Sequence, residues 1–260
     1  MRLLLTASLV FFLLPAVTRG QSVVNYDAGY WLTSGGPYTS VSARTIVPTA
    51  FPYVAPGTVA AMAGYVGIGN SPSFSANGFI QVGYAVTVSP DQSFSMGAIC
   101  NIFTAGGEFP CTTSSGPMHP GDVLDLSITC TAACTSLNAG TTWTFVVHDV
   151  TAGWTMTSPG VVAENLLNSA EWFIEANEVA SSGAASPRYG TALWSNLSTN
   201  LGAPTLSPSG NGTKYDDGLG STGFPSNQAG NAFNVCWGPS PTYATCDAPT
   251  ATPGMGRAHL

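Results

Sequence analysis

The sequence predicts an all-β protein, most simply an antiparallel β-sandwich, and three observations lead to this prediction. Many short stretches alternate apolar and polar residues with a period of two, which is the pattern of half-buried strands. Turn-forming residues are dense, with 30 glycines and 19 prolines among 260 residues. Helical periodicity is almost missing, so the crossover helices that join parallel strands are not expected. We expect one sandwich domain over residues 21–248 and a flexible tail over residues 249–260.

Residues 1–20 have the pattern of a secretory signal peptide. A positive residue near the start is followed by an apolar run over residues 3–14 and then by small residues. Cleavage is expected near Gly20, with Ala16 as the alternative site. The apolar run is shorter than a typical membrane span, and no later segment is long and apolar enough to cross a bilayer. We therefore expect a secreted, extracellular protein with no membrane partner.

Charge is scarce and its balance is acidic. Only 7% of the residues are charged, and removing the signal with its two arginines leaves 4 basic residues against 13 acidic ones, a net charge of −9. That balance disfavours nucleic acid and anionic membranes as partners. Hydrophobic residues make up 44% of the chain, which is enough for a packed core and unlike an intrinsically disordered sequence. We expect a monomer.

The cysteines and the glycosylation sequons both fit an exported protein. All six cysteines follow the signal, and they predict three disulfides formed in an oxidising compartment. Fifteen pairings are possible, and proximity in sequence favours Cys100–Cys111, Cys130–Cys134 and Cys236–Cys246. Metal binding is the weaker interpretation, because no Cys-x-x-Cys occurs and the three histidines are scattered. Sequons at Asn196 and Asn211 matter if the host is a eukaryote.

The first half of the chain contains predicted strands separated by turns rich in glycine and proline. Tyr30 and Trp31 precede a turn-rich segment. Strands are expected over residues 38–48, 60–68, 79–88 and 93–103. Prolines make the segment between the first two strands irregular, and residues 71–77 and 104–120 are expected to be loops.

The second half continues the same pattern. The turn Pro120-Gly121-Asp122 precedes a strand over residues 123–130. Further strands are expected over residues 141–150, over residues 154–157 and around Glu171. Residues 161–168 are expected to form one helical turn or a loop. After Ser181 the composition shifts to Ser, Gly, Pro and Asn, and residues 232–237 are the best remaining strand, which we expect to close a sheet rather than begin a second domain.

Two predicted strands each present one polar group on the face opposite the core. In the later one, Trp172 and Ile174 share the apolar parity and Glu171 points the other way. In the earlier one, Gln81 lies on the face of small residues, opposite a row of isoleucine, valine and tyrosine. In a chain this poor in charge, Glu171 and Gln81 are the strongest candidates for chemistry.

Other catalytic arrangements have less support. No Gly-x-Ser-x-Gly motif occurs, and His148 with Asp149 lacks a distinguished serine, so a surface histidine is the simpler interpretation. Glu171 and Glu175 are roughly 13 Å apart along one extended strand, too far for a glycosidase carboxylate pair. A glycosidase would need a partner from another strand, such as Asp125. No glycine-rich phosphate loop follows a strand, so no nucleotide cofactor is expected.

Several collinear stretches resemble the glutamic peptidases, the eqolisin or G1 family. Ser169-Ala-Glu-Trp-Phe-Ile-Glu175 resembles the Asn-Ala-Glu-Trp-Ile-Val-Glu segment of that family, and Phe79-Ile-Gln-Val-Gly83 resembles its Leu-Gln-x-Gly strand. Residues 38–48, 65–69, 120–122 and 147–151 are similar, in order and spacing, to further motifs of the family. The resemblance covers approximately residues 30–177.

The resemblance implies a concanavalin A-like sandwich of two curved antiparallel sheets, with the active site on the concave face. It makes Glu171 the catalytic glutamate and Gln81 its partner, acting on a polypeptide substrate without metal or other cofactor. A glutamate can take a proton from water and pass it to the leaving amine, and a carboxamide can bind the developing oxyanion. Trp31, Tyr65 and Gly69 are the expected substrate-binding residues, and Glu175 is expected to be a charge at the rim.

The sequence also departs from the family pattern. Tyr65 replaces the usual tryptophan, and Gly69 stands where the family commonly has aspartate. Residues 94–103 carry no carboxylate, although the family usually has tryptophan and acids after the glutamine strand. These differences predict a changed substrate preference and reduced or absent activity.

A second hypothesis is a non-catalytic sandwich that binds glycans or a cell-wall surface, because folds of this kind also serve lectins. The altered segment after Gln81 and the aromatic residues Trp31, Trp143 and Trp154 favour it. It predicts glycan binding that does not depend on Glu171, and no proteolysis.

Overall fold

A computed structural model of the chain describes the sandwich body. Its described residues are 22–24, 27–50, 60–69, 78–91, 93–104, 107–111, 115–134, 141–163, 167–176, 186–216, 220–239 and 246–250. The predicted signal and most of the predicted tail lie outside these residues. Strands are the regular secondary structure of the described ranges, which contain no helix that could span a membrane.

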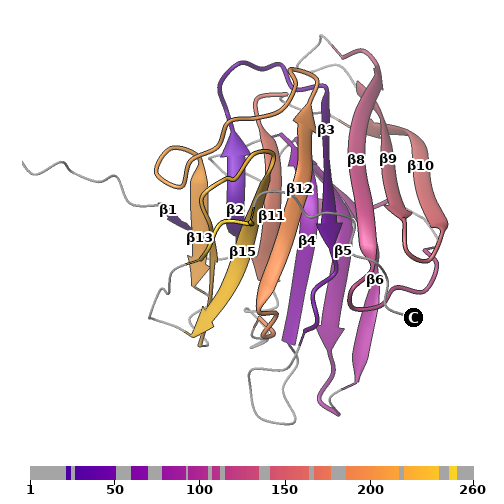
Figure 1. The fold of residues 1–260 in the computed structure, drawn as a ribbon. Coiled ribbons are helices and arrows are strands. Elements are labelled where there is room, and N and C mark those ends of the chain that lie inside the picture. The colour runs from indigo at the N-terminus through magenta and orange to yellow at the C-terminus, as the bar shows by residue number, and fades with distance from the viewer. Residues whose placement is uncertain are drawn as a thin grey trace, which may run out of the picture.

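The described residues form fifteen strands, labelled in chain order in Figure 1. They are β1 (Ser22–Val24), β2 (Asp27–Leu32), β3 (Ser40–Ile46), β4 (Ala60–Ile68), β5 (Phe79–Val88), β6 (Phe94–Thr104), β7 (Gly107–Pro110), β8 (Val123–Ala132), β9 (Thr141–Asp149), β10 (Trp154–Ala163), β11 (Ala170–Ala176), β12 (Thr191–Thr199), β13 (Gly212–Asp216), β14 (Ser221–Pro225) and β15 (Ala232–Pro239).

The strands form one continuous sheet that folds back on itself. Its order is β10-β9-β8-β3-β12-β15-β14-β13-β2-β11-β4-β5-β6-β7, and β1 pairs with β13. All pairs along this path are antiparallel, whereas β1 and β13 are parallel. Across the fold, β3 faces β4 and β11, and β8 faces β4 and β5. Figure 1 shows the resulting layers, with β8, β3, β12 and β15 in front of β5, β4, β11 and β2. The predicted antiparallel sandwich is confirmed.

The core lies between the two layers. From one layer Trp172, Tyr84 and Val66 point inward, and from the other Trp143 and Phe145 do the same, all fully buried. Removing a large apolar side chain from water contributes about 1.5–3 kcal/mol. Because side chains alternate along a strand, the residues between these positions form the two outer faces of the sandwich. One of those outer faces carries Glu171.

Most predicted strands are confirmed. Eight stretches that alternate in polarity or are continuously apolar form strands in the structure. They are residues 38–48 (β3), 60–68 (β4), 79–88 (β5), 93–103 (β6), 123–130 (β8), 141–150 (β9), 169–175 (β11) and 232–237 (β15). Strand β15 lies between β12 and β14, so it joins the existing sheet as expected.

Three parts of the sequence behave differently from the prediction. Strand β7 lies inside the predicted loop 104–120, paired with β6. Strand β10 runs on to Ala163, so residues 161–163 belong to a strand and not to the predicted helical turn or loop; residues 164–166 lie outside the described ones. Strand β2 begins before Tyr30, in a stretch where no strand was predicted.

The serine- and glycine-rich third of the chain holds β12, β13 and β14, which the sequence pattern did not reveal. In β12 the pairing with β3 shifts between Ser195 and Ser198, and Asn196 has a φ of 52°. Before the irregularity the buried residues are Ala192 and Trp194, and after it the next buried residue is Leu197. The period of two is therefore interrupted. Short strands β13 and β14 contain glycine or proline, so their own propensity for strand is low.

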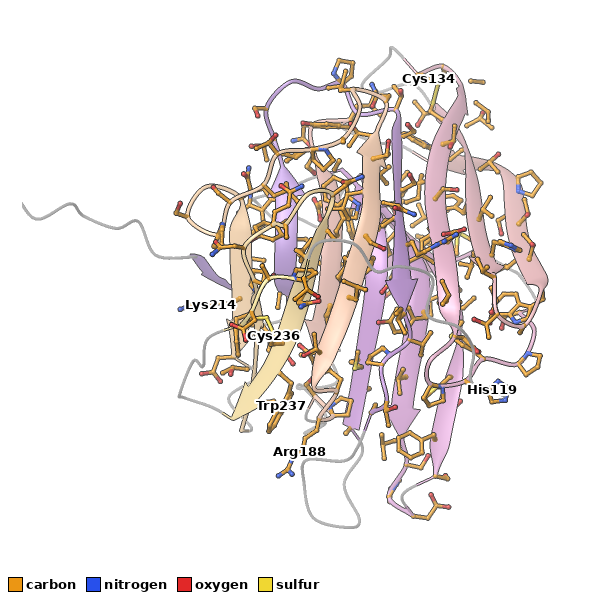
Figure 2. The ribbon with its side chains drawn as sticks, viewed as in Figure 1. His119, Cys134, Arg188, Lys214, Cys236 and Trp237 are labelled. Atoms are coloured by element: carbon orange, nitrogen blue, oxygen red, sulfur yellow. A yellow bond between two sulfur atoms is a disulfide. The ribbon has the colours of Figure 1, made fainter. Side chains whose placement is uncertain are left out.

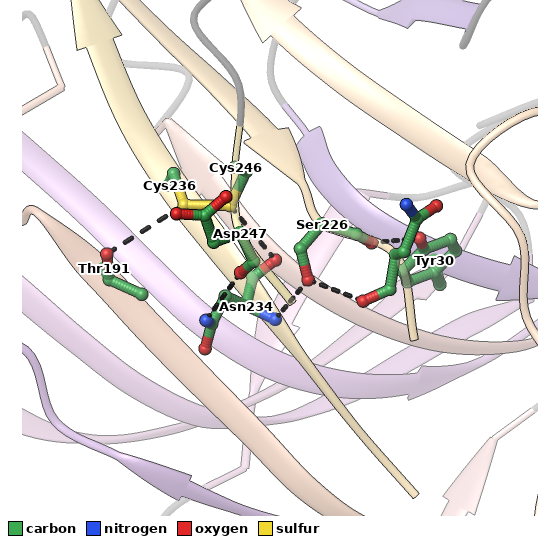
Figure 3. Close-up of a disulfide and its surroundings, with 8 residues drawn as sticks. Tyr30, Thr191, Ser226, Asn234, Cys236, Cys246 and Asp247 are labelled. Atoms are coloured by element: carbon green, nitrogen blue, oxygen red, sulfur yellow. Dashed lines mark hydrogen bonds between the residues drawn. A yellow bond between two sulfur atoms is a disulfide. The ribbon is translucent and has the colours of Figure 1, made fainter. Parts of the chain in front are cut away.

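The three disulfides expected from sequence proximity are present. They join Cys100 to Cys111, Cys130 to Cys134 and Cys236 to Cys246. Figure 3 shows the last of these beside Asn234, whose side-chain amide donates to the carbonyl of Asp247 at 2.9 Å. In the same view the backbone N–H of Asn234 donates to the Ser226 hydroxyl, and the Tyr30 hydroxyl donates to the Ser226 carbonyl.

The sheet end near β15 also holds a cation–aromatic contact. The Arg188 guanidinium lies 5.3 Å from the centroid of the Trp237 ring, and the two side chains are side by side in Figure 2. Such a contact is worth about 0.5–1 kcal/mol at an exposed site. Lys214 and Cys134, also labelled in Figure 2, lie at other margins of the sandwich.

Candidate active site

A row of five residues crosses the outer face of the layer that contains β11. The strand register places Trp31, Glu171, Gly67, Gln81 and Asn101 next to one another on β2, β11, β4, β5 and β6. Neighbouring strands are about 4.8 Å apart, so the backbones of Glu171 and Gln81 are separated by about 10 Å. Between them lies Gly67, which has no side chain of its own.

Gly67 keeps the space between the two polar groups free of a side chain of its own. A Cβ atom built there would lie 2.6 Å from Cε2 of Phe79 and 2.7 Å from its Cζ. The Phe79 ring therefore rests directly on the Gly67 backbone, on the Glu171 face. A larger residue at this position would have to displace the ring.

Glu171 is almost completely buried, with 1% of its surface exposed. The Ser169 hydroxyl lies 2.7 Å from Oε1 of Glu171 and donates to it. A carboxylate out of water is stabilised only by such partners, because desolvation strongly disfavours the charge. The two residues share one face because they are two positions apart along the chain.

Gln81 is also buried, with 3% of its surface exposed. Its Oε1 atom has no hydrogen-bond partner among the described residues. A buried polar atom left without a partner costs about 1–3 kcal/mol, so such atoms are uncommon and call for an explanation. A carboxamide offers an oxygen that accepts and a nitrogen that donates. The Gln81 side chain is thus suited to meet a ligand that supplies the missing bond.

Aromatic rings surround this row. Trp31, Phe173, Tyr65, Phe79 and Phe103 follow one another with ring centroids 6.2, 5.9, 5.9 and 5.5 Å apart. Phe173 and Tyr65 are buried, and the others are partly exposed. Surroundings of this kind have a low effective dielectric constant, which strengthens hydrogen bonds and charge interactions with a bound substrate.

A pair of acidic residues lies farther along the same face. Glu175 on β11 is directly opposite Asp27 on β2, and the Tyr65 hydroxyl donates to Oδ1 of Asp27 at 3.1 Å. Burial raises the pKa of Tyr65 well above its usual value, and the charges of Asp27, Glu175 and Glu171 raise it further. Tyr65 therefore stays neutral and keeps the hydroxyl proton that it donates to Asp27.

The structure brings most of the predicted site residues onto one face. Glu171, Gln81 and Trp31 stand in one row, and Trp31 is partly exposed. Tyr65 lies one row farther along, buried and bonded to an aspartate rather than projecting into solvent. Gly69 follows the end of β4, and its N–H donates to the Ser169 carbonyl at 3.2 Å. Their roles in catalysis and substrate binding stay predictions.

The Gly69 position explains one departure from the family pattern. Its φ is 150°, and a Cβ atom there would lie 2.4 Å from the carbonyl oxygen of Gly78. An aspartate would therefore not fit this backbone without a local rearrangement. The Gly69 carbonyl oxygen also lies 2.6 Å from the Ser169 hydroxyl oxygen.

Sequence reasoning missed three residues of this face, namely Ser169, Asn101 and Asp27. Ser169 could have been found, because it shares the parity of Glu171 in the segment that carries the resemblance. The place of Asn101 beside Gln81 depends on the register between β5 and β6, which the sequence does not specify. The place of Asp27 opposite Glu175 depends on the pairing of β2 with β11, a contact between residues far apart in the chain.

The other catalytic candidates lie elsewhere. His148 and Asp149 are neighbours on β9 and so point to opposite faces; Nδ1 of His148 lies 2.8 Å from Oγ1 of Thr155. Asp125 forms a two-pronged ion pair with Arg44 at 2.7 Å, on the outer face of the opposite layer. Asp125 therefore cannot act together with Glu171. The described residues contain no cluster of three or more His, Cys, Asp or Glu that could hold a metal ion.

Comparisons with known proteins bear on the family and the fold of this chain. Residues 26–221 match the family model of the peptidase A4 family. Similar solved structures include scytalido-glutamic peptidase with a transition state analog inhibitor, at 18% identity and a TM-score of 0.57, and the same peptidase with a peptide-based transition state analog, at 16% and 0.54. SCP-B, a member of the eqolisin family in complex with the tripeptide Ala-Ile-His, is similar at 16% identity and a TM-score of 0.52. Each comparison covers 82% of this chain and 98% of the other, and no curated protein matches.

Proposed function

The chain belongs to the peptidase A4 family, and from this premise we propose that it is a secreted glutamic endopeptidase that acts in acid through Glu171 and Gln81. The observation that supports the proposal most strongly is the cross-strand row, with the two polar side chains on either side of Gly67. Both are buried, both face the same way, and the Gln81 oxygen lacks a partner among the described residues.

Glu171 acts as the general base and then as the general acid. Its carboxylate removes a proton from the attacking water, and the neutral carboxyl passes that proton to the nitrogen of the leaving amine. The proton that leaves water thus ends on the amine, and the hydroxyl ends on the acyl carbon. Proton transfer by one positioned side chain accelerates a reaction by about 10²–10⁴-fold. Protonation of the leaving amine favours acidic pH.

Gln81 stabilises the charge that develops on the substrate carbonyl. Its side-chain N–H donates to the oxyanion, and its oxygen is available to orient the attacking water. A carboxamide does not titrate, so this function persists at low pH. Burial and the aromatic surroundings strengthen both interactions, because bulk water does not compete for them.

Export is part of the proposal and is supported by the signal pattern of residues 1–20 and by three disulfides. The substrate is a polypeptide chain, and its extended form suits a row that crosses several strands. SCP-B, a similar protein of the eqolisin family, has been solved in complex with the tripeptide Ala-Ile-His.

The glycan-binding alternative has less support in the structure than in the sequence. Trp143 is fully buried in the core, where its Nε1 donates to Oγ1 of Thr141 at 2.6 Å. Trp154 is partly buried and donates to the carbonyl of Pro117 at 2.9 Å. Of the three aromatic residues that suggested a binding platform, only Trp31 lies on the Glu171 face.

Hydrolysis of an acid-denatured protein at about pH 2–5 tests the proposal, with cleavage products identified by mass spectrometry. Wild type should cleave, and Glu171→Ala should lose about 10²–10⁴-fold in kcat. His148→Ala, on the opposite layer, is the matched control and should retain activity. Equal cleavage by wild type and Glu171→Ala, or cleavage by neither, would reject the assignment.

A further inference from the structure

The buried hydroxyl of Ser169 lies between Glu171 and Gly69, the residue that follows the end of β4. The Ser169 oxygen lies 2.7 Å from Oε1 of Glu171 and 2.6 Å from the carbonyl oxygen of Gly69. Ser169 has no exposed surface. A serine hydroxyl has one proton to donate and two lone pairs that accept. It therefore cannot donate to both oxygens at the same time.

The protonation state of Glu171 decides how this conflict is resolved. When Glu171 is ionised, its carboxylate and the Gly69 carbonyl compete for the single Ser169 proton. When Glu171 is neutral, its own O–H can donate to Ser169, and the Ser169 proton can turn to Gly69. Both short contacts are then ordinary hydrogen bonds. The same three oxygens thus accommodate both forms of Glu171, with only a rotation of the Ser169 hydroxyl.

We propose that Ser169 is the positioning residue of Glu171, holding the carboxyl group in one orientation through both halves of the reaction. The Ser169 hydroxyl donates to the Glu171 carboxylate before Glu171 takes the proton from water. It accepts from the carboxyl group once Glu171 holds that proton, and its own proton then turns to Gly69. The proposal rests on the proposed function of Glu171 and adds the group that keeps its geometry constant while its charge changes.

The backbone at this place is fixed independently of the hydroxyl. The Gly69 N–H donates to the Ser169 carbonyl at 3.2 Å, and the next residue, Ala170, already pairs with Ile68 in the sheet. Removing the hydroxyl should therefore leave the strand end in place. Its loss should affect the orientation of Glu171 more than the fold.

The kinetic test compares Ser169→Ala with Ser169→Thr, which keeps the hydroxyl. A hydrogen bond to a charged group is worth about 1.5–3 kcal/mol, so kcat of Ser169→Ala should fall about 10- to 100-fold with KM nearly unchanged. Ser169→Thr should recover most of kcat. If its melting temperature shows that the added methyl does not fit, Ser169→Asn serves instead, since asparagine stands here in the family segment that this stretch resembles.

A matched control separates this effect from the general loss of a buried serine. Ser221 is also fully buried, and its hydroxyl donates to the Ser186 carbonyl at 3.0 Å, away from the Glu171 row. Ser221→Ala should keep wild-type kcat. A kcat of Ser169→Ala within twofold of wild type would overturn the proposal, as would a Ser169→Thr or Ser169→Asn variant that folds but stays as slow as Ser169→Ala.

Crystal structures of wild type and Ser169→Ala, at the pH of the assay, keep this inference separate from the proposed function. The Glu171 carboxyl group should leave its wild-type position or occupy two rotamers in Ser169→Ala. An unchanged Glu171 would reject the positioning role even if the enzyme is active. If wild type cleaves nothing, the proposed function fails, while a displaced Glu171 still supports the contact between the two residues.

Discussion

The two outer faces of the sandwich are both formed by antiparallel strands, but their environments are opposite. In β3, in β9 and in the first part of β8, buried core residues alternate with more exposed residues of the outer face, where the polar side chains meet solvent. On the face of β4 and β11 there is no such alternation, because all nine residues of β4 and six of the seven in β11 are buried.

The polar and charged residues of the two faces differ in the same way. Arg44 and Asp125 pair with each other, with 39% and 41% of their side chains exposed. Glu171 and Gln81 have almost no exposure, and the Gln81 oxygen has no partner among the described residues. A solvated polar row needs no function to explain it, whereas buried polar groups with open bonding capacity do. Burial, and not the presence of charge, marks the candidate site.

The largest expected difference between the faces is in catalysis. Gln81→Ala removes the donor for the oxyanion and should lower kcat by about 10²–10³-fold. Asp125→Ala changes a charged residue on the opposite face and should leave kcat within twofold of wild type. Steady-state kinetics at the pH optimum measure both. A Gln81→Ala variant as active as Asp125→Ala would remove the distinction between the two faces.

A smaller effect should follow from filling the space at Gly67. The Cβ atom of Gly67→Ala would press on the Phe79 ring, and overpacking of this kind costs about 1–3 kcal/mol of folding free energy. Gly97→Ala is the control, since the nearest atom to its new Cβ is the Ser115 hydroxyl at 3.7 Å. Urea denaturation measures the free energy of unfolding. Equal stability of the two variants would show that the space above Gly67 is not confined.

The sequence predicted a large part of this arrangement, because its signals are local. The bounds of β4 follow from a continuous apolar run between glycine and proline segments, and the parity of Glu171 against Trp172 follows from the period of two. The disulfides followed from the short separations of their cysteines. Each of these depends on neighbours within about ten residues.

The rest depends on contacts between distant segments. No local pattern shows that the Glu171 face is buried, so the burial of Tyr65 could not be predicted from the sequence. The pairing of Asp27 with Glu175 needs β2 beside β11. Strand β12 was hidden because the irregularity at Asn196 interrupts its alternation.

Alkaline pH should destabilise the protein through its buried tyrosines. Burial raises the pKa of Tyr65, so the folded state resists ionisation of a phenol that ionises near pH 10 in the unfolded chain. This contribution to stability is complete below about pH 10 and is lost as pH rises above that value, by about 1.4 kcal/mol per pH unit. Tyr65→Phe should therefore lose stability less steeply than wild type in urea denaturation between about pH 9 and 11. Identical slopes of unfolding free energy against pH for wild type and Tyr65→Phe would contradict the raised pKa of Tyr65.

The smallest effect is expected for the ion pair of the solvated face. Exposed pairs contribute about 0.2–1 kcal/mol even with good geometry, because water and salt screen them. A double-mutant cycle of Arg44→Ala and Asp125→Ala should give a coupling energy below about 1 kcal/mol, falling as salt is added. A larger coupling that is insensitive to salt would mean that this face is less solvated than its exposure indicates.

Glu171→Gln tests the function of the buried face most directly. The substitution keeps the size of the side chain and its ability to bond Ser169, but removes the base. In an assay of denatured-protein hydrolysis over about pH 2–7, wild type should be active in acid, and Glu171→Gln should lose about 10²-fold or more in kcat while its melting temperature is unchanged or higher. A Glu171→Gln variant that folds and cleaves at the wild-type rate would contradict the assignment of Glu171 as the catalytic residue.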